Sequence, residues 1–130
     1  MNLRDLFLKE FRGQTIGTIT DQSSVEEMFQ NEVLRPILKL QNDLLIATFK
    51  EYIKKNKIDF IGFTTDKKMI IIENSVQKDI KFRNTLKGII IGLFTSEEYY
   101  LYSNTESYLN KRIISMLIER LKSQIQLIEL

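Results

Sequence analysis

The densest run of polar side chains lies at residues 77–87, and it is where binding chemistry is most readily built. Asp79 and Arg83 stand four residues apart, in the order that favours an ion pair on one helix face. We favour that ion pair, on a half-exposed helix. An arginine fork can also hold a carboxylate or a phosphate through two parallel hydrogen bonds. The alternative is therefore an anion-binding pocket around Arg83, with the ligand-binding residues Asp79, Lys81, Arg83 and Asn84.

A second pattern with possible chemistry is Ser75 followed three residues later by Lys78. This is the spacing of a serine nucleophile and its lysine, and residues three apart share a helix face. The companion motifs of the penicillin-recognising enzymes, Ser-Asp-Asn and Lys-Thr-Gly, are absent from the sequence. A chance match is expected in a chain rich in lysine, so we predict no catalytic residue.

The 130 residues include no histidine and no cysteine. Imidazole and thiolate are the usual protein ligands of zinc, haem and iron–sulfur clusters, so none of those sites can be built in its ordinary form. Carboxylate-only sites suit harder ions and need several converging acidic side chains. The glutamates cluster instead at expected helix starts, where the helix dipole favours them. We predict no metal and no cofactor, and we lean toward a protein that is not an enzyme.

The elements that carry these residues are expected to be helices. Three pairs have the spacing of a capping box, in which two side chains satisfy each other's backbone amide at a helix start. They are Ser24 with Glu27, Thr95 with Glu98, and Ser103 with Glu106. Pro36 lacks a backbone N–H and predicts a kink or a break in the helix after the first box.

The first helix is expected to be short and amphipathic. Leu3, Leu6, Phe7 and Phe11 share one face of it, and Gly13 ends it.

Apolar residues keep helical spacing through most of the chain, and one Pro and five Gly give few breakers. We predict a single all-α domain over residues 1–130, an irregular bundle of about four to six helices. The alternative is an α+β fold with a small hairpin near residues 58–73, where two apolar runs flank a polar turn. We prefer a helix there because Met69, Ile72 and Val76 keep helical spacing.

Gly88 and Gly92 stand four residues apart on one expected helix face. Glycine in a helix interior costs about 0.8–1 kcal/mol against alanine, but it lets another backbone come close. We predict a helix–helix contact at these glycines, either inside the bundle, which we favour, or between the two copies of a homodimer.

Basic residues exceed acidic ones by two, and the most basic stretch, residues 57–87, holds seven basic and four acidic side chains. Nucleic-acid binding needs a denser basic stripe, so we rank it last. No apolar run is long enough to span a bilayer, and the start does not have the pattern of a signal peptide. The absence of cysteine suits a reducing compartment. We expect a cytoplasmic protein with no membrane contact.

Three blocks carry a resemblance to a known family: residues 34–44, residues 77–95, and the stretch from 109–112 through 119–123. Over nearly the whole chain, the sequence resembles short bacterial proteins of unknown function that are often labelled glyoxalase. The resemblance implies a bacterial protein that is helical over residues 66–77. Metal-dependent glyoxalases hold their metals with histidine, which is absent here, so the resemblance implies no site residue.

Taken together, these patterns favour a non-enzymatic helical protein that works through protein–protein contacts, with a homodimer as the expected form. The alternatives are a small enzyme or ligand-binding protein with the anion pocket around Arg83 and, last, a nucleic-acid-binding protein.

Overall fold

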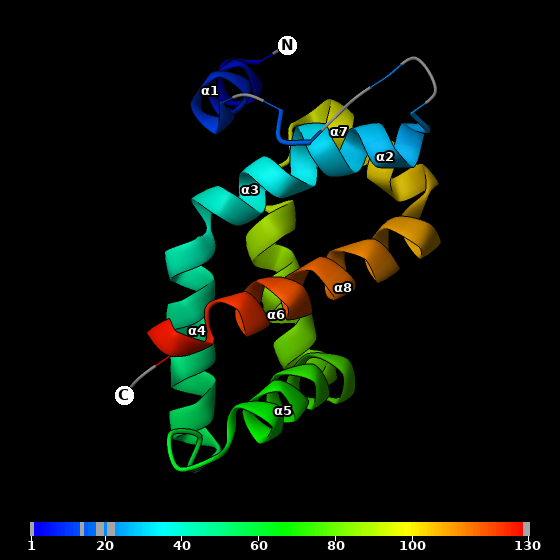
Figure 1. The fold of residues 1–130 in the computed structure, drawn as a ribbon. Helices are drawn as coiled ribbons and strands as arrows, with labels where there is room; N and C mark the ends of the chain where they lie inside the picture. Colours follow the sequence, from blue (N-terminus) through cyan, green and yellow to red (C-terminus); the bar gives the residue numbers. More distant parts are fainter. Residues whose placement is uncertain (1, 14, 18–19, 21–22, 129–130) are drawn as a thin grey trace.

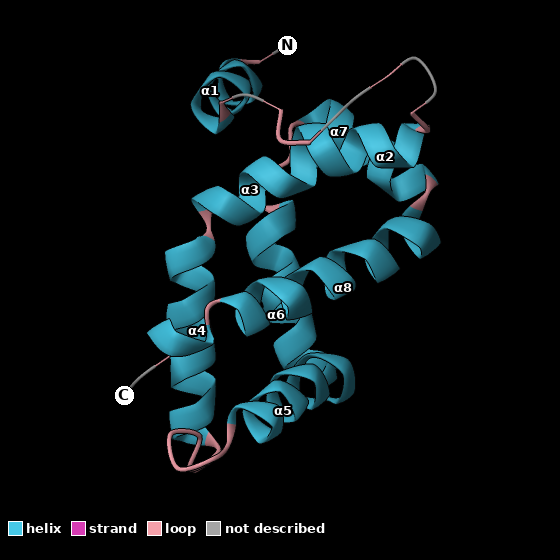
Figure 2. Cartoon of the chain, in the orientation of Figure 1, coloured by secondary structure: helices cyan, strands magenta, loops and turns pink. Residues whose placement is uncertain are grey.

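The computed structural model describes the whole chain except residues 1, 14, 18–19, 21–22 and 129–130. The described residues form helices and the loops that connect them, with no strand among them (Figures 1 and 2). The helices are α1 (Leu3–Arg12), α2 (Val25–Phe29), η1 (Gln30–Leu34), α3 (Arg35–Leu40), α4 (Asn42–Lys55), α5 (Thr65–Lys78), α6 (Ile80–Ile91), α7 (Ser96–Asn104), α8 (Glu106–Ser123) and η2 (Ile125–Leu127). The predicted all-α class is confirmed, with slightly more helices than the four to six expected.

The helical segment that contains Pro36 is continuous from α2 through η1 into α3. Its middle, η1, is a π-helical turn, in which the backbone N–H of Arg35 donates to the carbonyl of Gln30. Such a turn lets the helix accommodate the missing donor of a proline. The chain changes direction at Gln41, between α3 and α4 (Figure 1). The irregularity predicted at Pro36 is thus a π-turn, and the break lies farther along the chain.

The segment between α4 and α5 is a compact turn, so the alternative hairpin near residues 58–73 is wrong. Phe60 is fully buried in this turn and meets the ring of Phe49 edge-on, with 5.6 Å between ring centroids. The following helix starts at a cap: the hydroxyl of Thr64 accepts the backbone N–H of Lys67 at 3.2 Å. Local capping and one anchored aromatic ring therefore decide in favour of a helix.

The core lies where α4, α5, α6 and α8 pack against one another. Helix α8 contacts the other three and runs across α6 in Figure 1, and its apolar side is buried. The largest fully buried side chains are Phe49, Phe60, Leu34, Ile37, Leu45, Ile53, Ile72, Leu86, Ile90, Leu109, Ile113 and Leu117.

The three predicted capping boxes have different outcomes. The box of Thr95 and Glu98 is complete, with each side chain bonded to the other's backbone amide. Ser24 caps α2 in one direction, by accepting a backbone amide at 3.1 Å. The third box is wrong: the hydroxyl of Ser103 donates to the carbonyl of Tyr100 at 2.8 Å, and α8 starts without a side-chain cap.

Candidate functional site

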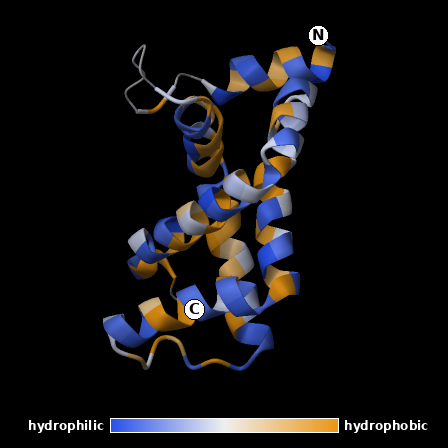
Figure 3. Cartoon of the chain, turned by 90° about the vertical axis from the view of Figure 1, so that its right-hand side faces the viewer, coloured by the Kyte–Doolittle hydropathy of each residue, from blue (hydrophilic) through white to orange (hydrophobic). Residues whose placement is uncertain are grey.

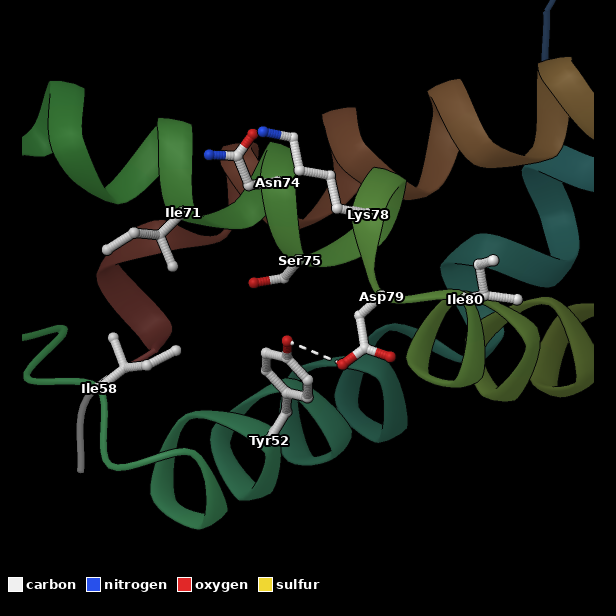
Figure 4. A pocket seen from close by; sticks show the side chains of 8 residues that line it. All are labelled: Tyr52, Ile58, Ile71, Asn74, Ser75, Lys78, Asp79 and Ile80. Carbon is white, nitrogen blue, oxygen red and sulfur yellow. Dashed lines mark hydrogen bonds between the residues drawn. The ribbon is translucent and has the colours of Figure 1, made fainter.

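A depression of about 580 Å³ lies where α4 meets the junction of α5 and α6 (Figure 4). Tyr52 comes from α4, Ser75 from α5, and Asp79 from the break between α5 and α6. The break places the Asp79 carboxylate at the start of α6, where it accepts the backbone N–H of Phe82 at 3.1 Å. The other lining residues are the aliphatic Ile58, Ile71 and Ile80 and the polar Asn74 and Lys78.

Three polar side chains of this depression bond to one another: Tyr52, Ser75 and Asp79. The hydroxyl of Tyr52 donates to Asp79 Oδ2 at 3.1 Å, and its ring stacks on Phe82 with 4.0 Å between centroids. Burial raises the pKa of Tyr52; a hydrogen bond from Ser75 opposes the shift, and the Asp79 carboxylate adds to it. Tyr52 therefore stays protonated and donates its hydroxyl proton in the hydrogen bond to Asp79. This arrangement fixes α4 against α6, and it does not present a free base.

The serine–lysine pattern is not assembled into a catalytic pair. Ser75 points toward Tyr52, whereas the side chain of Lys78 extends away from Ser75 toward the outer side of α5 (Figure 4). A serine nucleophile needs its base within hydrogen-bonding distance.

The predicted anion pocket around Arg83 is only partly brought together. Asp79 and Lys81 line a second depression of about 610 Å³, on the other side of Tyr52. Arg83 lines neither depression, because its guanidinium Nη1 donates to the carbonyl of Gln77 at 2.9 Å. Asn84 is exposed and lines neither depression. No ion pair joins Asp79 to Arg83 among the described residues, so that prediction is wrong.

The two glycines of α6 do not lie in a close helix crossing. A methyl group built on Gly88 would meet no atom within 4 Å, and one built on Gly92 would meet only the carbonyl oxygen of Gly88, at 3.0 Å. The predicted close crossing within the chain is therefore wrong at these positions. Helix α6 packs through its other face, which carries Leu86 and Ile90. A contact with a second copy at these glycines stays a prediction.

The most unusual surface is on α1. This helix forms as predicted and ends at Gly13, whose positive φ of 84° suits glycine. Its apolar face, however, points away from the rest of the molecule. The residues of this face, with their exposed fractions, are Leu3 (85%), Leu6 (53%), Phe7 (61%) and Phe11 (59%). Figure 3 shows α1 along an edge of the molecule, with hydrophobic residues among hydrophilic ones. The rings of Phe7 and Phe11 stack on each other, with 5.5 Å between centroids.

The opposite face of α1 is polar and buried. The Arg12 guanidinium makes two hydrogen bonds to the Glu98 carboxylate, at 2.6 and 2.8 Å, and a third to the carbonyl of Leu93 at 2.8 Å. Asp5, which is 4% exposed, accepts the backbone N–H of Ser96 at 3.1 Å. We call these contacts of Asp5 and Arg12 the α1 anchor. The anchor joins α1 to the loop that follows α6 and to the first turn of α7.

Electrostatics favour the charged form of the anchor. Burial by itself raises the pKa of Glu98, but the hydrogen bonds from Arg12 and from the Thr95 amide outweigh burial, and the pKa is lowered overall. Sequence reasoning identified the apolar face of α1 and missed the anchor. The spacing of three and four residues places Asp5, Leu8 and Arg12 on one face of the helix. This spacing is the signal from which a second, inward face could have been predicted.

Among the described residues, no group of three acidic side chains is placed to hold a metal ion. None of the described helices combines the length and the apolar character that crossing a bilayer requires. In comparisons with known proteins, no family model, no curated protein and no solved structure matched this chain. The resemblance to glyoxalase-labelled proteins therefore stays a prediction.

Proposed function

We propose that this chain is a non-enzymatic protein that works by self-association, and that the apolar face of α1 is its contact surface. One observation carries the proposal: α1 is held to the body by buried ionic contacts while Phe7, Phe11 and two leucines face outward. Large exposed apolar patches mark interaction surfaces. A helix held in this way presents its patch in a defined orientation, which lowers the entropic cost of binding.

The charge pattern of α1 favours a second copy as the partner. Helical spacing places Glu10 between Leu3 and Leu6 on the exposed face, since it follows them by seven and four residues. In an antiparallel pair of α1 helices centred on Phe7, Leu3 of one copy lies opposite Phe11 of the other. The same symmetry brings Arg4 of one copy, whose side chain is 52% exposed beside its own Gly92 carbonyl, to the same level along the helix pair as Glu10 of the other. A two-fold interface is self-complementary in this way.

A lipid surface suits the same face less well, because insertion would bury the Glu10 carboxylate among acyl chains at a large cost in free energy.

The dimer is expected to be weak. A ten-residue helix is about 15 Å long, whereas a stable interface buries about 800 Å² on each partner. Tyr99 and Tyr100 extend the surface, since they line a groove of about 340 Å³ together with Arg4. The cytoplasm remains the proposed compartment.

Sedimentation velocity over a range of protein concentrations tests the proposal. The wild type should shift from monomer to dimer as its concentration rises, and Phe7→Ser should weaken the dimer by about tenfold or more. Ile70→Ser is the matched control, because Ile70 is 56% exposed on α5, at the far end of the molecule (Figure 1). Glu10→Arg should also weaken the dimer by setting like charges opposite each other. A wild type that stays monomeric, or a Phe7→Ser variant that dimerises normally, contradicts the proposal.

A further inference from the structure

A groove of about 330 Å³ between α3 and α8 gathers three arginines, and no contact described so far uses it. Arg35 comes from α3, while Arg112 and Arg120 come from α8. The two arginines of α8 are eight residues apart, so they lie on one face of the helix, two turns from each other. We call this feature the arginine groove. Its other lining residues are Leu38, Met116, Glu119 and Ser123.

Two of the three guanidinium groups of the groove are held in place, and none of the three forms an ion pair with a described residue. Arg35 Nε donates to Asn31 Oδ1 at 2.9 Å, and Arg112 Nε donates to Gln30 Oε1. The terminal nitrogens of these two arginines, and the whole side chain of Arg120, have no hydrogen bond or ion pair with the residues that the structure describes. Three positive charges therefore line the groove, and Glu119 at its side offers one negative charge.

Three arginines arranged in this way are suited to bind an anion that has several oxygen atoms. Arginine presents a rigid fork of donors that matches phosphate and carboxylate, and it stays charged at every physiological pH. Two of the three forks are already oriented through their Nε atoms, which leaves their terminal N–H groups to bind a ligand. A multiply charged anion placed between them would also relieve the repulsion among the three cations.

The size and walls of the groove limit the ligand further. A volume of about 330 Å³ is at the small end of ligand pockets, so it fits a small molecule rather than a polymer. Leu38 and Met116 are buried side chains that give the groove an apolar floor. The Glu119 carboxylate can accept a hydrogen bond from a hydroxyl or an amino group.

We propose that the arginine groove binds a small phosphate-bearing ligand. The phosphate lies among Arg35, Arg112 and Arg120, and an organic part with a hydroxyl or amino donor reaches Glu119. The ligand is a free polyphosphate or a phosphate ester; both bind through the same oxygens, and only the ester also uses Glu119.

The test is a titration followed by ¹H–¹⁵N spectra, including the arginine Nε–H signals, at constant ionic strength. The probes are inorganic phosphate, pyrophosphate and ribose 5-phosphate. We expect saturable shifts at Arg35, Arg112 and Arg120 with pyrophosphate or ribose 5-phosphate. Glu119→Gln should weaken ribose 5-phosphate binding and not pyrophosphate binding if the ligand is an ester, and should not weaken either if it is a free polyphosphate.

Arg120→Gln is the decisive variant, because the Arg120 side chain makes no hydrogen bond or ion pair with a described residue. It should weaken binding about tenfold or more, the effect of losing hydrogen bonds to a charged group. Arg120→Lys should fall between that variant and the wild type, since it keeps the charge and loses the fork. Arg83→Gln is the matched control, because Arg83 lies on α6 outside the groove, and it should bind within twofold of the wild type.

Three results would overturn the proposal. The first is the absence of saturable binding by any probe. The second is an equal loss of binding in Arg120→Gln and Arg83→Gln, which indicates general attraction to a basic surface. The third is a single-stranded oligonucleotide that binds more tightly than the small probes and shifts residues well beyond the groove, which indicates nucleic acid instead.

Discussion

The α1 anchor should hold its helix with a free energy that can be measured locally. In the variant Arg12→Met the Glu98 carboxylate stays largely buried and loses its charged partner. The side chains of Arg12 and Glu98 are only 5% and 13% exposed, so water replaces little of the lost interaction. Removing one partner of a buried ion pair costs about 3–5 kcal/mol.

Most of this cost should appear as undocking of α1 and little of it as unfolding of the whole chain. Leu8 is the only apolar side chain of α1 that is buried, so α1 contributes little to the core. An undocking free energy lowered by about 3 kcal/mol makes amide exchange about a hundredfold faster. We expect that acceleration in α1, and little change in α4 and α8.

Native-state hydrogen exchange, read by mass spectrometry or nuclear magnetic resonance, measures the effect for each helix. Glu98→Gln is the partner variant, because glutamine can still cap α7 while it removes the charge. The double variant Arg12→Met with Glu98→Gln should lower the undocking free energy of α1 by less than the sum of the two single variants. Each single variant already removes the same interaction. Additive losses, or exchange in α1 that matches the wild type, would refute the reasoning. Acceleration shared equally by α1 and the core would refute it too.

Three further predictions concern single groups. Gly88→Ala should raise the free energy of unfolding by about 0.5–1 kcal/mol in chemical denaturation, because the position is helical and open to solvent. Tyr52→Phe should lower it by about 1 kcal/mol in the same assay, because the ring still stacks on Phe82 and only the hydrogen bond to Asp79 is lost. Because the pKa of Glu98 is lowered below its ordinary value of 4.5, the anchor is fully stabilising above that pH and weakens as the pH falls through the lowered pKa. Amide exchange in α1, corrected for intrinsic rates, should therefore rise in acid before that of the core.

Helix positions were predictable because their signals are local. Each of these signals needs only a few neighbouring residues. The structure confirms the capping box of Thr95 with Glu98 and the end of α1 at Gly13. The choice between hairpin and helix after residue 58 was harder, because both patterns fit a short apolar run. A buried ring, Phe60, and a cap at Thr64 decide it, and a single sequence does not show burial.

The predicted anion site failed for a reason that involves the end of a helix. Residues four apart can pair only if both side chains are free to do so. Helix α5 ends at Lys78, so the last carbonyls of that helix lack partners within it, and Arg83 donates to one of them, that of Gln77. The break at Asp79 that creates this carbonyl also turns the Asp79 carboxylate toward Tyr52 and the start of α6.

The arginine groove could not be predicted from the sequence, for a different reason. Arg35 and Arg120 are 85 positions apart in the sequence, and only the crossing of α3 and α8 brings them to one groove. Neither arginine belongs to a dense basic stretch, so charge counting along the chain does not find them. A cluster built from two helices becomes visible only after the fold is known.

The orientation of α1 follows from the surface that it meets. That surface is the end of α6 and the start of α7, where carbonyls and amides lack partners within their own helices. Arg4 and Arg12 donate to the carbonyls of Gly92 and Leu93 at the end of α6, and Asp5 accepts an amide at the start of α7. Cations thus lie at the negative end of one helix dipole, and an anion lies at the positive end of the next. An apolar inner face would leave those backbone groups unpaired, at about 1–3 kcal/mol each. The polar face of α1 must therefore point inward, and Leu3, Leu6, Phe7 and Phe11 are left on the outside, where a second copy can cover them.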